Sequence, residues 1–194
     1  MTTIGVLALQ GGVREHATML QGLGAAVRLV KKVEDLDGLD GLVLPGGESS
    51  VIDRLARSFG VAEPIREAIA AGLPVLGTCA GLILLAERLE NPAPGQQTFG
   101  GLDVTVRRNA FGSQRDSFDA SIPVAGVEGE IDVSFIRAPI VVSHGPGVEV
   151  IARVRDAIVG VRQGNVIGLS FHPEVTGDDR VHRQFLAEVA RHDG

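Results

Sequence analysis

The sequence is poor in cysteine and lysine and contains no long apolar run. A single cysteine, Cys79, excludes an internal disulfide bond and any metal cluster built from several thiolates. No apolar stretch approaches the roughly 20 residues that a membrane-spanning helix needs. Lys31 and Lys32 are the only lysines among 18 basic residues, which we interpret as compositional bias. Residues 1–4 lack the basic region and cleavage site of a signal peptide, and we therefore expect a reducing, cytoplasmic location.

The rest of the composition is typical of a globular protein. The chain has 194 residues, of which 44% are hydrophobic, so it can bury a sizeable core, and we expect one domain over residues 1–194. The formal net charge of −6 argues against nucleic acid as the main partner. The sequence also lacks the Gly-x-x-x-x-Gly-Lys pattern of a phosphate-binding loop.

Apolar runs and helical spacings alternate along the chain. The runs that are typical of buried strands cover residues 4–9, 25–30, 39–44, 73–76 and 166–171. Helical patterns cover residues 13–23, 51–58, 64–71, 82–89 and 179–190. Short β-type segments between residues 102 and 161 indicate antiparallel additions. We predict an α/β fold of three layers: an open, mostly parallel sheet, helices on both of its faces, and flanking antiparallel strands.

The pentapeptide Gly77-Thr78-Cys79-Ala80-Gly81 joins a predicted strand to a predicted helix. Gly-x-Cys-x-Gly is the pattern of a nucleophile elbow with sulfur in place of oxygen. Such an elbow presents its nucleophile at the carboxyl edge of the sheet and at a helix N-terminus, which favours a thiolate. A lone free cysteine is usually a small buried hydrophobe, but the flanking glycines favour a nucleophile here.

His172-Pro173-Glu174 follows the last predicted strand. A cysteine nucleophile needs a base, and the base gains from a group that orients it. Residues two apart point the same way in extended chain, so Glu174 can reach the imidazole of His172. Alone, this histidine could simply end a strand with one backbone hydrogen bond, but together with the elbow it favours a catalytic role.

Other polar segments give weaker signals. Residues 45–50, Pro-Gly-Gly-Glu-Ser-Ser, can aim backbone N–H groups at a ligand, although they can equally form a tight turn. The arginines of residues 107–112 and 135–139 are weak signals alone. The four remaining histidines, His16, His144, His182 and His192, have no ligand spacing, so we expect no metal site and assign them no role.

These motifs together resemble the class I triad glutamine amidotransferases. The closer resemblance is to the PdxT family, the glutaminase subunits of pyridoxal 5′-phosphate synthase. It is carried by the elbow and by residues 5–11, 44–50, 108–112, 135–139 and 170–174. Residues 91–101 and 113–130 carry no motif that we can assign.

The resemblance implies a flavodoxin-like fold and the hydrolysis of L-glutamine without a cofactor. Cys79 would attack the side-chain amide, His172 would transfer protons, and Glu174 would orient His172. The resemblance implies an oxyanion hole from the N–H groups of Gly47 and Ala80, adjusted by Gln10. The glutamine-binding residues that it implies are Gly46, Gly47, Glu48, Ser49, Arg108, Ile136 and Arg137. It leaves open which arginine binds the α-carboxylate.

The resemblance also implies a partner. Ammonia becomes ammonium in neutral water and loses its nucleophilicity, so we expect the chain to dock on the (β/α)₈-barrel synthase subunit, PdxS, in a hetero-oligomer. By resemblance, docking switches on the glutaminase. Two alternatives stay open: a thiol peptidase on a similar sheet, and a binding module in which Cys79 is inert.

Overall fold

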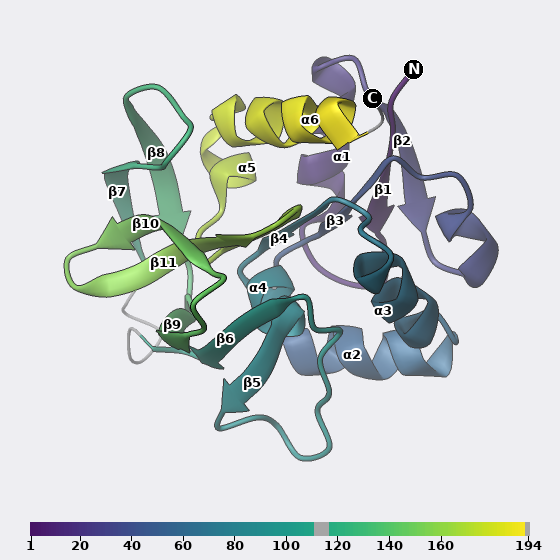
Figure 1. The fold of residues 1–194 in the computed structure, drawn as a ribbon, viewed down its shortest axis with the longest axis horizontal. Helices are drawn as coiled ribbons and strands as arrows, with labels where there is room; N and C mark the ends of the chain where they lie inside the picture. Colours follow the sequence, from purple (N-terminus) through teal and green to yellow (C-terminus); the bar gives the residue numbers. More distant parts are fainter. Residues whose placement is uncertain (111–116, 193–194) are drawn as a thin grey trace.

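The computed structural model describes residues 1–110 and 117–192 (Figure 1). Phe111 and Gly112, which belong to one of the motif segments, lie outside the described residues. In chain order the elements are β1 (Thr3–Leu7), α1 (Val13–Gly22), β2 (Ala26–Val30), η1 (Val33–Leu36), β3 (Gly41–Leu44), α2 (Ser49–Ser58), α3 (Ala62–Ala70), β4 (Val75–Thr78), α4 (Ala80–Leu85), β5 (Ala86–Glu90), β6 (Leu102–Arg107), β7 (Phe118–Pro123), β8 (Glu130–Phe135), β9 (Ile140–His144), β10 (Glu149–Val154), β11 (Ala157–Gln163), β12 (Val166–Leu169), α5 (Pro173–Thr176) and α6 (Arg180–His192).

Ten of the strands in the described residues form one sheet. Its order is β2-β1-β3-β4-β12-β11-β9-β6-β5, and β10 pairs with β11. The pairs from β2 to β12 are parallel, and those from β12 through β11 and β9 to β6 are antiparallel. β7 and β8 form a separate antiparallel pair. This arrangement confirms the predicted α/β fold with a parallel centre and antiparallel additions.

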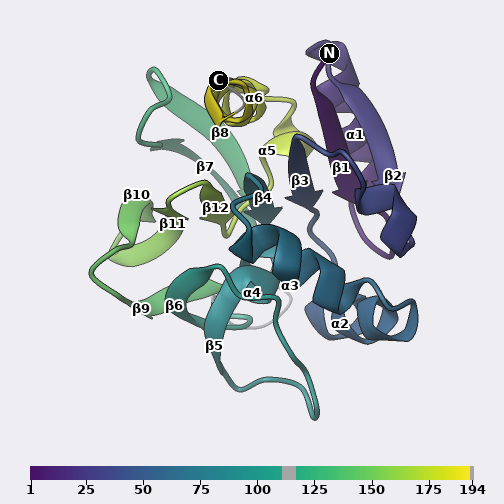
Figure 2. The same ribbon diagram turned by 45° about the vertical axis from the view of Figure 1, so that its right-hand side comes forward.

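Two hydrophobic cores lie on opposite faces of the sheet. On β3, Leu42 and Leu44 belong to one core and Val43 to the other, as the period of two in a strand requires. The first core is completed by α2, α3 and α4, and the second by α1, α6 and the β7–β8 pair. Figure 2 shows the helices of the two cores above and below the central strands. The predicted three-layer arrangement is therefore confirmed.

The helix predicted over residues 82–89 is wrong in its second half. Helix α4 ends at Leu85, and residues 86–90 form β5, which pairs with β6. The carbonyl of Leu84 accepts hydrogen bonds from the amides of Phe99 (2.6 Å) and Gly100 (3.3 Å). In a longer helix this carbonyl would accept its hydrogen bond from an amide of the next helical turn, but here it accepts from a distant loop instead. The prediction also missed η1, α5 and β7.

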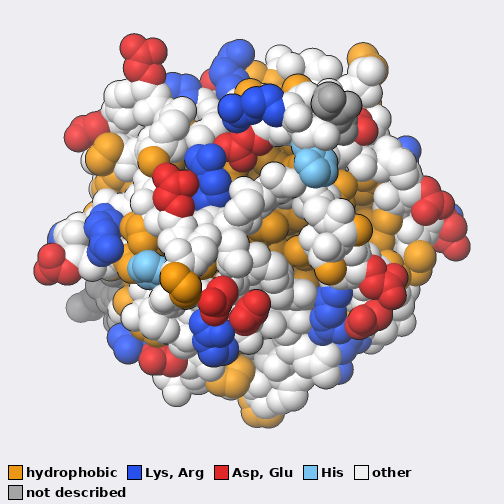
Figure 3. All heavy atoms as spheres, viewed as in Figure 1, with side chains coloured by type: hydrophobic (Ala, Val, Ile, Leu, Met, Phe, Trp, Pro, Cys, Tyr) orange, Lys and Arg blue, Asp and Glu red, His pale blue; other side chains and the backbone are white. Residues whose placement is uncertain are grey.

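The surface carries charges of both signs. On the face drawn in Figure 3, acidic and basic side chains are interspersed. None of the helices formed by residues 1–110 and 117–192 is long and apolar enough to cross a membrane.

Candidate active site

Cys79 sits on a sharp turn between β4 and α4. Its backbone has φ 50° and ψ −100°, a conformation that is strained for a residue with a side chain. A Cβ atom on Gly81 would lie 2.1 Å from the carbonyl oxygen of Leu44, and one on Gly77 would lie 2.7 Å from the carbonyl carbon of Gly81. The flanking glycines are thus required by close packing, which is the geometry that the elbow pattern predicts.

The sheet register brings Cys79 and His172 to the same edge. β4 and β12 are parallel neighbours, with Leu169 opposite Thr78. The amide of Cys79 donates to the carbonyl of Leu169 (2.7 Å), and the amide of His172 donates to the carbonyl of Ser134 on β8 (2.9 Å). Backbone hydrogen bonds therefore hold both residues at the carboxyl end of the parallel strands, where α/β proteins bind ligands.

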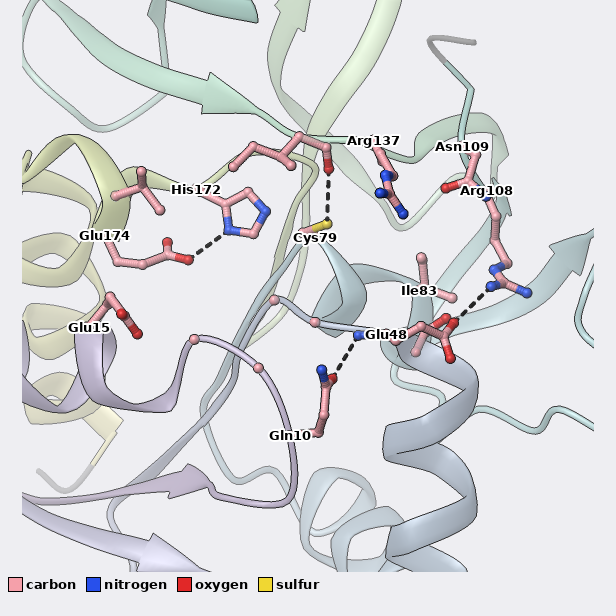
Figure 4. A pocket seen from close by; sticks show the side chains of 17 residues that line it. Gln10, Glu15, Glu48, Cys79, Ile83, Arg108, Asn109, Arg137, His172 and Glu174 are labelled. Carbon is pink, nitrogen blue, oxygen red and sulfur yellow. Dashed lines mark hydrogen bonds and ion pairs between the residues drawn. The ribbon is translucent and has the colours of Figure 1, made fainter. Parts of the chain in front are cut away.

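Glu174 and Cys79 lie on opposite sides of the His172 ring (Figure 4). The Nδ1 atom of His172 is 2.8 Å from Oε1 of Glu174. The reason given for this contact from sequence is wrong, because Glu174 lies in the short helix α5 and not in extended chain. The sulfur of Cys79 also lies 3.9 Å from the carbonyl oxygen of Ile136.

The electrostatics of the three groups favour an ionised imidazole. Burial lowers the pKa of His172, but its hydrogen bonds and charge interactions with Cys79 and Glu174 outweigh burial and raise that pKa to about 10. For Glu174 burial acts in the opposite direction and raises the pKa, because it disfavours the charged carboxylate. The interactions with His16 and His172 outweigh burial and lower the pKa of Glu174 well below its usual value. The Glu174 carboxylate therefore stays charged and stabilises a proton on His172.

The three groups open onto a cavity of about 750 Å³. It is lined by Gln10, Gly11, Gly12, Glu15, Gly46, Gly47, Glu48, Ser49, Cys79, Ile83, Arg108, Asn109, Ile136, Arg137, His172, Glu174 and Val175. Every site residue predicted from the sequence lines this cavity except Ala80, which follows Cys79 in the chain and is fully buried.

The glycine loop packs closely against the imidazole. A Cβ atom on Gly46 would lie 2.2 Å from Cε1 of His172, and one on Gly47 would lie 2.4 Å from Oε1 of Gln10. The carbonyl of Gly46 accepts a hydrogen bond from the amide of Gly12 (2.9 Å). Because the C=O and N–H of one peptide point in opposite directions, the N–H of Gly47 is directed away from Gly12. Gln10 holds the loop by accepting a hydrogen bond from the amide of Glu48 (2.8 Å).

Glu48 and Arg108 form an ion pair at the other end of the cavity. Nη2 of Arg108 lies 3.0 Å from Oε1 of Glu48. The Glu48 carboxylate also caps helix α2, where it accepts hydrogen bonds from the amides of Ser50 (3.3 Å) and Val51 (3.0 Å). Sequence reasoning missed Gln96, whose amide donates to Oγ of Ser49 (2.9 Å) and accepts from Arg108 (3.0 Å).

Strained backbone gathers around the cavity. Of the five non-glycine residues with positive φ in the described residues, Cys79, Asn109 and Arg137 line it. Such conformations concentrate at functional sites, where the surrounding structure holds them. Figure 4 shows the guanidinium groups of Arg108 and Arg137 on the side of the cavity away from Glu174.

Sequence reasoning also missed two buried histidines behind Glu174. The Nε2 atom of His16 lies 3.4 Å from Oε1 of Glu174 and 3.0 Å from Oγ1 of Thr78. Its Nδ1 atom lies 2.9 Å from Nε2 of His182. No sequence signal links these residues, because His182 is 166 positions from His16. Within the described part of the chain, no three His, Cys, Asp or Glu side chains are arranged to hold a metal ion.

The fold and the pocket define an enzyme of the class I glutamine amidotransferase type, with an elbow cysteine beside a histidine that follows the neighbouring strand. The model of the SNO glutamine amidotransferase family matches residues 6–191, and the chain belongs to this family.

Two relatives and one solved structure agree with this assignment. The pyridoxal 5′-phosphate synthase subunit PdxT of Corynebacterium glutamicum (strain R) is 60% identical over 193 residues, which cover 97% of this chain and 96% of the relative. The PdxT of Cutibacterium acnes is 58% identical over 194 residues, 96% of either chain. A crystal structure of a glutamine amidotransferase superposes with a TM-score of 0.91 at 47% identity, covering 96% of this chain and 98% of that one. The resemblance stated from sequence is confirmed, and a glutaminase is favoured over a peptidase or a binding module.

Proposed function

We propose that this protein hydrolyses L-glutamine to L-glutamate and ammonia through Cys79, His172 and Glu174, acting as a single domain over residues 1–194. The observation that carries the proposal is the shared cavity: a strained elbow cysteine, an imidazole hydrogen-bonded to a buried carboxylate, and two arginines all face one space. An amide substrate with a charged amino-acid end fits such a cavity.

The first half-reaction forms a thioester. The sulfur of Cys79 attacks the side-chain amide carbon of glutamine, and the carbonyl oxygen becomes an oxyanion. The N–H groups of Gly47 and Ala80 would stabilise it, at about 3 kcal/mol for each donor. Ala80 is the first residue of α4, so its N–H is not used inside the helix. His172 then gives its proton to the nitrogen, ammonia leaves, and the glutamyl thioester remains on Cys79.

The second half-reaction releases glutamate. His172, now neutral, takes a proton from a water molecule that attacks the thioester carbon. The carbon–sulfur bond breaks, glutamate leaves, and the proton on His172 restores the starting state. Glu174 holds Nδ1 of His172 throughout, so that Nε2 faces the reacting atoms.

The arginines would bind the amino-acid end of glutamine. A guanidinium offers a planar pair of donors that matches the two oxygens of a carboxylate. Gly46, Gly47, Glu48, Ser49 and Ile136 would complete the binding surface, since all of them line the cavity.

The ammonia would pass to a synthase subunit. The relatives named PdxT are described as subunits of pyridoxal 5′-phosphate synthase, and they match nearly the whole chain. We therefore propose that this chain docks on a (β/α)₈-barrel synthase subunit in the cytoplasm and that docking raises its glutaminase activity.

The test is a coupled assay of glutamate and ammonia formation from glutamine. Wild type with the synthase subunit should turn over glutamine, and wild type alone should be much slower. Cys79→Ala should lose at least about 10⁴-fold in kcat. A Cys79→Ala protein that keeps its activity would reject the nucleophile, and equal rates with and without the synthase subunit would reject activation by docking.

A further inference from the structure

The polar cluster behind the triad extends the hydrogen bonding of Glu174 into the protein interior. It consists of His16 on α1, Thr78 at the end of β4 and His182 on α6, all fully buried. One histidine nitrogen, Nε2 of His16, faces both Glu174 Oε1 (3.4 Å) and Thr78 Oγ1 (3.0 Å). His16 thus stands between the carboxylate that orients His172 and the residue that precedes the nucleophile.

Glu174 depends on few partners. Its Oε1 atom faces both His172 and His16, whereas its Oε2 atom is buried with no hydrogen-bond partner among the described residues. A buried carboxylate is costly unless neighbouring donors compensate it. The loss of His16 would therefore leave Glu174 with a single donor, His172, and with freedom to turn away from the ring.

The position of the ring protons of His16 and His182 follows from one buried nitrogen atom that has no hydrogen-bond partner. Nδ1 of His182 is buried without a partner in the described residues, while Nε2 of His182 meets Nδ1 of His16 at 2.9 Å. Buried N–H groups without acceptors are rarer than buried acceptors without donors. The proton of His182 therefore belongs on Nε2, where it is donated to His16. Burial is the largest cause that lowers the pKa of His182, to about 3, so its ring carries a single proton.

That assignment fixes the other end of His16. If Nδ1 of His16 accepts from His182, the proton of His16 must be on Nε2. This N–H then lies within hydrogen-bond distance of the Thr78 hydroxyl (3.0 Å) and close to the Glu174 carboxylate (3.4 Å), whose negative charge favours a donor over a lone pair here. The opposite tautomer would place a lone pair of His16 against Glu174 and a proton on the orphaned nitrogen of His182.

We propose that His16 is a positioning residue for the triad. Its Nε2–H holds Glu174 in the orientation that receives His172, and His182 selects the His16 tautomer that carries this N–H. The proposal rests on the proposed glutaminase function for its kinetic consequence, but the tautomers can be measured without any activity.

The kinetic test compares two substitutions of His16 in the complex with the synthase subunit. His16→Gln can bring an amide N–H to the place of Nε2, whereas the shorter His16→Asn reaches only the place of Nδ1. His16→Asn should lower kcat by about tenfold to a hundredfold, with KM within threefold, because proton transfer and not binding is disturbed. His16→Gln should keep at least a third of the wild-type kcat. Equal losses in the two variants, or a change confined to KM, would overturn the proposal.

Two further measurements guard against a purely structural effect. Val189→Ala removes a buried side chain from α6, the helix that carries His182, and should leave kcat within twofold. Nitrogen NMR of histidine-labelled wild type should find the ring protons of His16 and His182 on Nε2. A proton on Nδ1 of either ring would overturn the proposal even if the protein proved inactive toward glutamine. Inactivity of wild type with these tautomers in place would instead count against the proposed function.

Discussion

The two ends of the cavity differ in burial and in what holds them. At the proposed catalytic end, the side chains of His172 and Glu174 are 11% and 1% exposed, and Cys79 is buried. Cys79 and His172 follow two neighbouring parallel strands. At the proposed binding end, Arg108 and Glu48 stand on loops, and their side chains are 18% and 45% exposed. Backbone hydrogen bonds hold Cys79 and His172 in place, whereas the Arg108 guanidinium is held by side-chain bonds to Glu48 and Gln96.

Because the two ends differ in this way, we expect substitutions at each end to affect different kinetic constants. A shift at the catalytic end moves reacting atoms, and small displacements there are costly in rate. A change at the proposed binding end should alter contacts that substrate and transition state share, and KM should therefore change. The four predictions below test that division, from the largest expected effect to the smallest.

Gly46→Ala should lower kcat by about a hundredfold. The new Cβ would lie 2.2 Å from Cε1 of His172, so the imidazole or the loop must move. Steady-state kinetics of the complex measure the effect. Gly22→Ala is the matched control, because its Cβ would meet nothing within 4 Å. Wild-type kcat in Gly46→Ala would mean that the ring need not stay where the loop holds it.

Arg108→Lys should raise KM by about tenfold to a hundredfold with a smaller effect on kcat. Lysine keeps the charge but loses the planar pair of donors that meets Glu48 and Gln96. Arg107→Lys is the control, because this neighbour is exposed and pairs with Glu90. A fall in kcat at unchanged KM would show that Arg108 belongs functionally to the catalytic end.

Cys79→Ala should lower the pKa of His172 from its value of about 10, which NMR titration of the ring can measure. Burial lowers this pKa, and the hydrogen bonds and charges of Cys79 and Glu174 raise it, so removal of the sulfur removes part of the raising effect. The folded pKa exceeds the usual 6.5, so the stability from His172 is present below pH 6.5 and lost as the pH rises toward 10. In the variant this loss should begin at the same pH, near 6.5, but it should be smaller and complete at a lower pH. An unchanged pKa would mean that sulfur and imidazole do not interact.

Glu48→Ala should lower the free energy of unfolding by about 1 kcal/mol, because the helix α2 loses its cap. Urea denaturation measures the difference. Glu63→Ala is the control, since this carboxylate is 68% exposed and pairs with Arg66 on its own helix. A loss of stability no greater than that of the control would leave Glu48 with a role toward substrate alone.

The residues of the proposed catalytic end could be predicted from the sequence because the patterns that indicate them are local. The glycines on either side of Cys79 indicate a turn with no room for side chains. His172 follows a strand that pairs with the strand before Cys79, and both strands were predicted from their apolar runs. Even here the local structure differed, because Glu174 reaches His172 from a short helix. The catalytic roles of these residues stay predictions until they are tested by substitution.

The parts that the sequence could not reveal depend on distant contacts. Helix α4 ends early because the amides of Phe99 and Gly100 donate hydrogen bonds to the carbonyl of Leu84. No sequence pattern near Leu84 indicates these bonds. Gln96 lies in a segment without a motif, yet it joins Ser49 to Arg108. His16 and His182 are in contact because α1 and α6 pack against the same face of the sheet, an arrangement that no local pattern predicts.

The central claim is that Cys79 is the nucleophile that attacks glutamine. The most direct measurement treats the complex with an electrophilic glutamine analogue and determines the adduct by intact mass and peptide mapping. We predict one adduct, on Cys79, whose formation glutamine slows and which Cys79→Ala does not form. If peptide-based electrophiles label Cys79 as well as the glutamine analogue does, or if glutamine does not slow the labelling, the assignment of Cys79 as the nucleophile that attacks glutamine is contradicted.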